Sequence, residues 1–70
     1  MNRLELNAAI ARAGMTQQQL AEKLGISMVQ MSRKMNGVSD FWRHEINSMR
    51  HILHLSDDDT VRIFFTDKVS

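Results

Sequence analysis

The sequence predicts an all-α protein of five short helices that fold as a single domain over residues 1–70. The length suits one small domain. The chain has no proline and only three glycines, a composition typical of helices joined by short turns. Several small polar residues also stand three positions before Glu, Gln or Asp, which is the pattern of a helix capping box.

The capping pairs predict where four of the helices begin, because each side chain of a pair satisfies a free backbone N–H. The pairs are Asn2 with Glu5, Thr16 with Gln19, Ser27 with Gln30 and, more weakly, Ser56 with Asp59. Gly14 and Gly37 stand where a left-handed turn is expected to end a helix. With the apolar spacing, these signals predict helices over residues 3–13, 17–24, 28–35, 43–54 and 57–65.

Apolar residues at helical spacing predict one hydrophobic core. Its methionines, Met31, Met35 and Met49, are expected to fill gaps rather than to bind a ligand. The full expected core is Leu6, Ala9, Ile10, Met15, Leu20, Ala21, Leu24, Ile26, Met31, Met35, Ile46, Met49, Leu53, Val61 and Phe64.

Composition and charge exclude several classes of protein. The absence of cysteine excludes disulfides and thiolate metal sites and fits a reducing cytoplasm. No apolar run is long enough for a signal peptide or a membrane span, so neither is expected. Residues 1–35 carry five basic and two acidic side chains, and residues 36–70 carry four and six. This uneven charge permits nucleic-acid binding without requiring it.

We expect neither an enzyme nor a cofactor. No cleft-sized fold surrounds a candidate nucleophile, base and electrophile. The titratable cluster is His44, His51 and His54, all within the helix expected over 43–54. His51 and His54 have a spacing that could share a metal ion, but no acidic residue or third histidine is placed with them. A polar outer helix face explains them, and no metal site is expected.

The segment over residues 16–37 predicts two helices joined by a tight turn. Gly25 permits that turn, and Ala21 is small where the two helices must cross closely. Leu20, Leu24 and Ile26 are expected to fix the pair to the core. A second helix held in this way projects from the surface, and the major groove of DNA is wide enough to accept it. This spacing indicates a helix-turn-helix unit.

The same segment resembles the phage Cro and repressor (XRE-like) family, with a lambda-repressor-like helix-turn-helix domain. The fit rests on Thr16, Gln17, Leu20, Ala21, Leu24, Gly25, Ile26, Ser27, Met31, Ser32, Asn36 and Gly37. The later part is similar to short lytic-switch regulators of Gram-positive bacteriophages, in Phe41, Glu45, Ile46, Ile63, Phe64 and Phe65. The resemblance implies a transcriptional regulator of a lysis–lysogeny switch that binds double-stranded operator DNA.

The resemblance also implies roles for individual residues. Gln17 begins a helix, where free N–H groups and the helix dipole favour a phosphate. Arg33 is the best candidate for a base contact, because guanidinium can bond two acceptors of guanine. The expected base-facing residues are Met28, Val29, Ser32 and Arg33, and the expected phosphate contacts are Lys34, Asn36, Arg43 and His44.

The apolar side chains of Met28 and Val29 leave a second interpretation open. Related regulators usually carry polar side chains where Met28 and Val29 stand, and apolar side chains cannot bond a base. With Trp42 and Arg33 they would form a good protein interface. The alternative function is therefore an anti-repressor that binds the DNA-binding domain of a cognate phage repressor and blocks its operator binding.

The last predicted helix and the tail, residues 56–70, are also expected to form a dimer. Val61 and Phe64 suffice to cover the preceding helix, which leaves Ile63 and Phe65 pointing elsewhere. A small domain rarely exposes two large apolar groups to water. A two-fold homodimer would bury them and place two recognition helices about 34 Å apart, one DNA turn.

Overall fold

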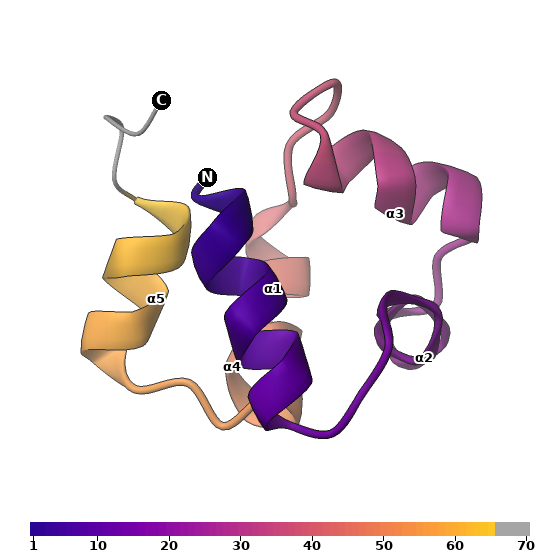
Figure 1. Ribbon diagram of the computed structural model, residues 1–70. Helices are drawn as coiled ribbons and strands as arrows, with labels where there is room; N and C mark the ends of the chain where they lie inside the picture. The colour runs from indigo at the N-terminus through magenta and orange to yellow at the C-terminus, as the bar shows by residue number, and fades with distance from the viewer. Residues whose placement is uncertain (66–70) are drawn as a thin grey trace.

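The computed structural model describes residues 1–65, which form five α-helices and no strand (Figure 1). The helices are α1 (Arg3–Arg12), α2 (Gln17–Leu24), α3 (Met28–Met35), α4 (Arg43–Ile52) and α5 (Asp57–Phe64). α2 packs against both α3 and α4, whereas α1 packs against α5. All five predicted helices are therefore confirmed, with ends one or two residues earlier at α1, α4 and α5. α4 ends early because His54 takes a left-handed backbone, φ 56°.

The predicted capping boxes are present at three helix starts. Full boxes begin α2, α3 and α5, and at α1 the Asn2 side chain accepts from the Glu5 N–H at 3.2 Å. The sequence analysis missed the cap of α4, where Glu45 Oε1 accepts from the Trp42 N–H at 2.8 Å. A tryptophan at the N-cap position gives no sequence signal, since its side chain has no acceptor. Each helix start is thus fixed by a local hydrogen bond.

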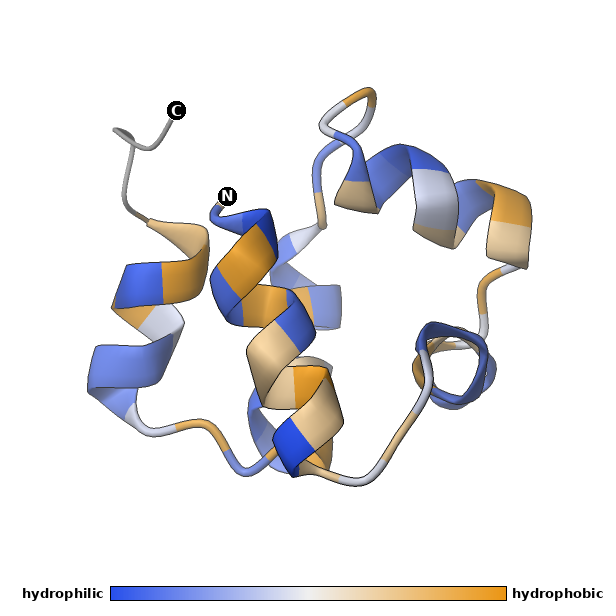
Figure 2. Ribbon diagram, in the orientation of Figure 1, coloured by the Kyte–Doolittle hydropathy of each residue, from blue (hydrophilic) through white to orange (hydrophobic). Residues whose placement is uncertain are grey.

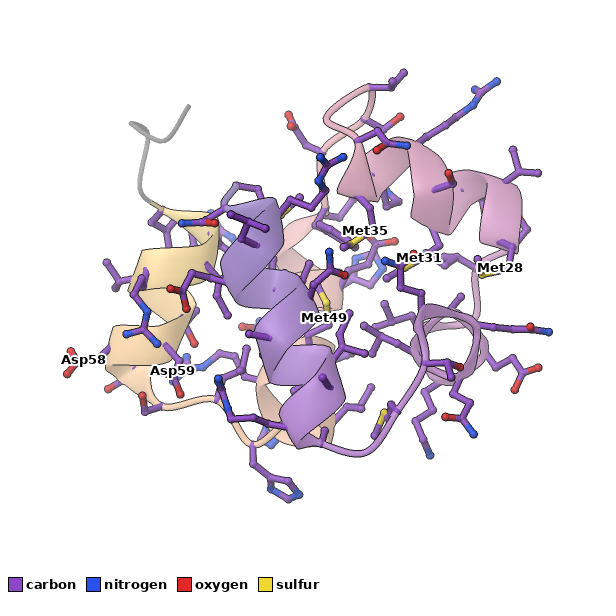
Figure 3. All side chains as sticks on the ribbon, in the orientation of Figure 1. Met28, Met31, Met35, Met49, Asp58 and Asp59 are labelled. Carbon is purple, nitrogen blue, oxygen red and sulfur yellow. The ribbon has the colours of Figure 1, made fainter. Side chains whose placement is uncertain are left out.

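The core lies between the helices and is lined by methionine and branched aliphatic side chains. Met31, Met35 and Met49 point into it, as expected, while Met28 lies at the outer end of α3 (Figure 3). The buried apolar residues are Leu6, Ala9, Ile10, Leu20, Ala21, Met31, Met35, Phe41, Met49, Leu53, Leu55 and Ile63. Phe41 and Leu55 were not predicted because they lie in connections, where helical spacing carries no information.

The face of α5 that points into the core differs from the predicted one. Ile63 is fully buried, whereas Val61 is 55% exposed, so Val61 does not belong to the core. The inward stripe is Thr60, Ile63 and Phe64. Thr60 tolerates burial because its hydroxyl donates to the Ser56 carbonyl at 2.9 Å. Ile63 is therefore wrong as a dimer residue, since its side chain already packs inside the domain, while Phe65 is exposed.

Hydrogen bonds and ion pairs hold α5 to the rest of the domain. The Asn2 N–H donates to the Ile63 carbonyl at 2.6 Å, which ties the start of α1 to the end of α5. Arg62 contacts Glu5 on α1 and Asp59 on its own helix. α5 thus lies alongside α1 (Figure 1), on the opposite side of the domain from α3.

Candidate nucleic-acid interface

α2 and α3 are joined by the predicted tight turn. Gly25 takes φ 76°, a left-handed backbone that favours glycine, and nothing lies within 4 Å of where its Cβ would be. The Ile26 N–H donates to the Ala21 carbonyl at 3.0 Å and closes the turn. Ala21 and Leu20 are buried at the crossing. The helix-turn-helix unit predicted from the sequence is therefore present.

α3 presents its outward face to solvent while its inward face enters the core. Met31 and Met35 are buried, whereas the four expected base-facing residues are all exposed, namely Met28, Val29, Ser32 and Arg33. The first turn of α3 is coloured hydrophobic at the outside of the molecule (Figure 2). The outer surface of α3 is thus both accessible and partly apolar.

An open hollow lies on this outer surface. It is lined by Met28, Val29, Ser32, Arg33, Asn36 and Val38, which we call the α3 hollow. Val29 is 65% exposed and Val38, beyond the end of α3, is 72% exposed. The sequence analysis grouped Trp42 with Met28 and Val29, but Trp42 does not line this hollow. Val38 lines the hollow in place of Trp42, because the turn after Gly37 folds back along the end of α3, where the Val38 N–H donates to the Arg33 carbonyl.

Lys34 is not available to a phosphate, contrary to the prediction. Its side chain is buried, and its Nζ lies 3.2 Å from Glu45 Oε1 and donates to the Asp40 carbonyl at 2.9 Å. The ammonium also lies 5.8 Å from the centroid of the Phe41 ring. This buried ion pair ties the end of α3 to the start of α4. Sequence spacing could not reveal it, because the two partners belong to different helices.

Two other predicted contacts are held by side chains from α1. Gln17 is half-buried, and its Nε2 donates to Asn7 Oδ1 at 2.9 Å. Asn36 Oδ1 accepts from Arg3 Nη1 at 2.8 Å, and Asn36 Nδ2 lies 3.5 Å from Ser32 Oγ. Arg3 is therefore brought to the edge of the α3 hollow from a position 33 residues away in the sequence. No local pattern marked Arg3.

The first turn of α4 carries the remaining predicted residues. Arg43, His44 and Trp42 are exposed. The Trp42 and His44 rings meet edge to face with centroids 5.8 Å apart. This arrangement packs His44 against Trp42 and leaves the Arg43 side chain accessible.

The groups with displaced pKa values lie on α5. The backbone N–H of Ser56, with the Arg62 guanidinium, lowers the pKa of Asp59. The Asp59 carboxylate, with Glu5, raises the pKa of Arg62. Within residues 1–65, no three His, Asp or Glu side chains are grouped as a metal ion would require. Among the helices of that range, none has the length and hydropathy needed to cross a membrane.

Comparison with known proteins agrees with the geometry. Residues 3–36, from the start of α1 to the end of α3, match the family described as bacterial regulatory protein, Fis family. No curated protein and no solved structure matches the chain. The chain therefore contains a helix-turn-helix unit similar to that of bacterial regulatory proteins. This match supports the helix-turn-helix prediction but not the Cro and repressor type that the sequence resembles.

Proposed function

We propose that the protein regulates transcription by placing α3 in the major groove of an operator. The carrying observation is that α2 and the core fix α3 while its whole outer face, including Arg33, stays exposed. A helix of this diameter fits the major groove. Arg33 would then bond guanine, with Ser32 beside it. Asn36 lines this surface and would contact the phosphate backbone. Arg43 and His44 on α4 and the Gln17 side chain at the start of α2 would add further phosphate contacts.

A binding titration tests this function. A duplex from the adjacent intergenic DNA and a scrambled duplex of equal length are titrated with the protein at several salt concentrations. We expect tighter binding to the intergenic duplex and an affinity that falls steeply with salt, because bound cations are released from the phosphates. Arg33→Ala should reduce the preference, whereas Arg12→Ala in the last turn of α1 is the matched loss of charge. Equal affinity for both duplexes would contradict the proposal.

We further propose that the protein acts in a bacteriophage lysis–lysogeny switch. This role is supported by the resemblance of residues 16–37 to Cro and repressor domains. Its test is genetic context: the operator found by titration should lie between two divergent promoters, one of which transcribes a lysogeny repressor. An operator elsewhere would contradict the phage role and leave operator binding intact.

A second candidate function is an anti-repressor, favoured by the apolar part of the α3 hollow. Met28, Val29 and Val38 are exposed where a DNA-binding protein usually places polar groups. Burial of such side chains against protein is favourable by about 25 cal/mol per Å² before association costs. The partner would be the DNA-binding domain of a cognate repressor, which would lose access to its operator.

Calorimetry with that repressor domain separates the two functions. An anti-repressor complex should depend weakly on salt and compete with the operator of the repressor. Met28→Asp should abolish the complex, and Trp42→Ala tests whether the interface extends to α4. Leu4→Asp, at an exposed position of α1, is the control for Met28→Asp. If no complex forms at high micromolar concentration while operator DNA binds, the anti-repressor function is excluded.

A further inference from the structure

The α3 hollow combines exposed apolar side chains with positive charge. Three of its six lining residues are apolar, namely Met28, Val29 and Val38, and Arg33 supplies a positive charge. Asn36, at its rim, accepts a hydrogen bond from Arg3, so a second guanidinium lies at its edge. None of the six lining residues is acidic. The hollow is therefore suited to an apolar group that is surrounded by negative charge.

The major groove of DNA contains one apolar group of that kind. Guanine, cytosine and adenine present hydrogen-bond donors and acceptors there, whereas thymine also presents its C5-methyl group. Phosphates border the groove on both sides. An exposed valine contacts a methyl group well and can satisfy no base donor or acceptor. The charge around the hollow favours DNA over an apolar protein surface as its occupant.

The spacing along α3 restricts which bases can be contacted together. Val29 and Arg33 are four residues apart, so they lie on the same face with Cβ atoms about 5–6 Å apart. Successive bases of one strand are about 3.4 Å apart. Two side chains separated by this distance reach bases one or two steps apart.

We propose that the α3 hollow selects operators by contacting thymine methyl groups within about two base pairs of a guanine bonded by Arg33. Val29 supplies the central contact, with Met28 and Val38 on either side. This inference rests on the proposed operator binding and names what the apolar residues of that site recognise.

The test begins with duplexes selected by the protein from a random DNA library. Each thymine of the selected site is then replaced in turn by deoxyuridine, which removes the methyl group and leaves base pairing unchanged. We expect about fourfold weaker binding at one or more thymines near a guanine, since a buried methyl or methylene group contributes about 0.8 kcal/mol. Replacement outside the site should have no effect.

A variant assigns the methyl contact to the hollow. Val29→Ala should weaken binding to the thymine duplex and abolish the difference between thymine and deoxyuridine at one position. Val61→Ala on α5 removes the same atoms from another exposed valine and should leave that difference unchanged. Arg33→Ala should instead relax the preference for the neighbouring guanine.

Other outcomes would overturn the thymine contact, operator binding or both. Selected duplexes that bind equally well with deoxyuridine would overturn the thymine contact and leave operator binding standing. Failure to select any sequence would overturn operator binding itself. If, in that case, the repressor domain binds and Val29→Ala weakens it, the hollow is a protein interface and both DNA proposals are wrong.

Discussion

α3 and α5 begin alike but expose different kinds of side chain. Each has eight residues and begins with a complete serine capping box, closed by Gln30 in α3 and by Asp59 in α5. On α5, three of the four charged side chains are paired with neighbours: Arg62 contacts Glu5 and Asp59, and Asp57 contacts Arg50. On α3 the lysine of the last turn is turned inward and the apolar side chains of the first turn are turned outward.

The contrast supports α3 as the surface that a partner would cover. A surface helix of a globular protein usually buries its apolar side chains and exposes its charges, as α5 largely does. α3 reverses this at Lys34 and at Val29, and the buried ammonium needs Glu45 and the Asp40 carbonyl to compensate it. A small domain keeps an exposed apolar face where a partner covers it. α5 therefore closes the domain, and the exposed apolar face of α3 supports its proposed role as the binding surface.

The largest expected effect comes from the ion pair beneath α3. Lys34→Met should destabilise the fold by about 3–5 kcal/mol, because it leaves the Glu45 carboxylate buried without its partner. The double variant Lys34→Met, Glu45→Gln removes both charges, keeps the side-chain oxygen that caps α4 and should recover most of that loss. Urea denaturation followed by circular dichroism measures both. Arg62→Gln, which breaks the exposed pairs of α5, is the comparison and should cost far less. A double variant as unstable as the single one would contradict this account.

The next effect tests the register of α5. Ile63→Ala should cost about 2–5 kcal/mol, because its side chain is fully buried, whereas Val61→Ala should change stability by no more than about 0.5 kcal/mol. Thermal unfolding separates the two variants. Phe65→Ser is the corresponding change for the proposed two-fold dimer and should lower the sedimentation coefficient at high concentration without lowering stability. A monomer at all concentrations would exclude the dimer.

A smaller effect separates base contacts from phosphate contacts. Arg33→Ala should weaken specific binding by about 1–3 kcal/mol and relax the preference at one base pair. Gln17→Ala should weaken binding to all sequences alike, since a phosphate contact carries no sequence information. Titration of the operator and its single-base variants measures both. Equal, sequence-independent losses would make Arg33 a phosphate contact.

Local signals predicted most of the fold, and long-range contacts escaped them. Capping pairs such as Ser27 with Gln30 lie within one turn, so the sequence contains the whole interaction. Two long-range contacts, Lys34 with Glu45 and Arg3 with Asn36, form only when separate helices pack together. No local sequence pattern therefore marks either pair.

The candidate site divides in the same way. The exposure of Val29 and Arg33 follows from the periodicity of α3, and it was predicted. The burial of Lys34 was not, because a lysine near a helix end is ordinarily solvated. The choice of Val61 over Ile63 failed because Thr60, a polar residue, completes the inward stripe of α5.

The smallest effect concerns the two capping boxes at acid pH. Asp59 has a pKa lowered from its ordinary value of 3.8, chiefly by the Ser56 N–H. A carboxyl group with a lowered folded-state pKa stabilises the fold above its unfolded pKa, and that contribution disappears as the pH falls through the folded-state pKa. Gln30 has no charge to lose. Acidification below about pH 4 should therefore weaken the start of α5 and spare that of α3.

Amide exchange measured by NMR tests this difference between the helices. The Ser56 N–H, bonded to Asp59 Oδ2 at 3.1 Å, should lose protection as the pH falls, after correction for the intrinsic exchange rate. The Ser27 N–H, bonded to Gln30 Oε1 at 3.0 Å, should keep its protection. Asp59→Asn retains a carbonyl acceptor and should remove the pH dependence at Ser56. Parallel loss at both amides would mean that acid unfolds the whole domain, and the two boxes would then not differ.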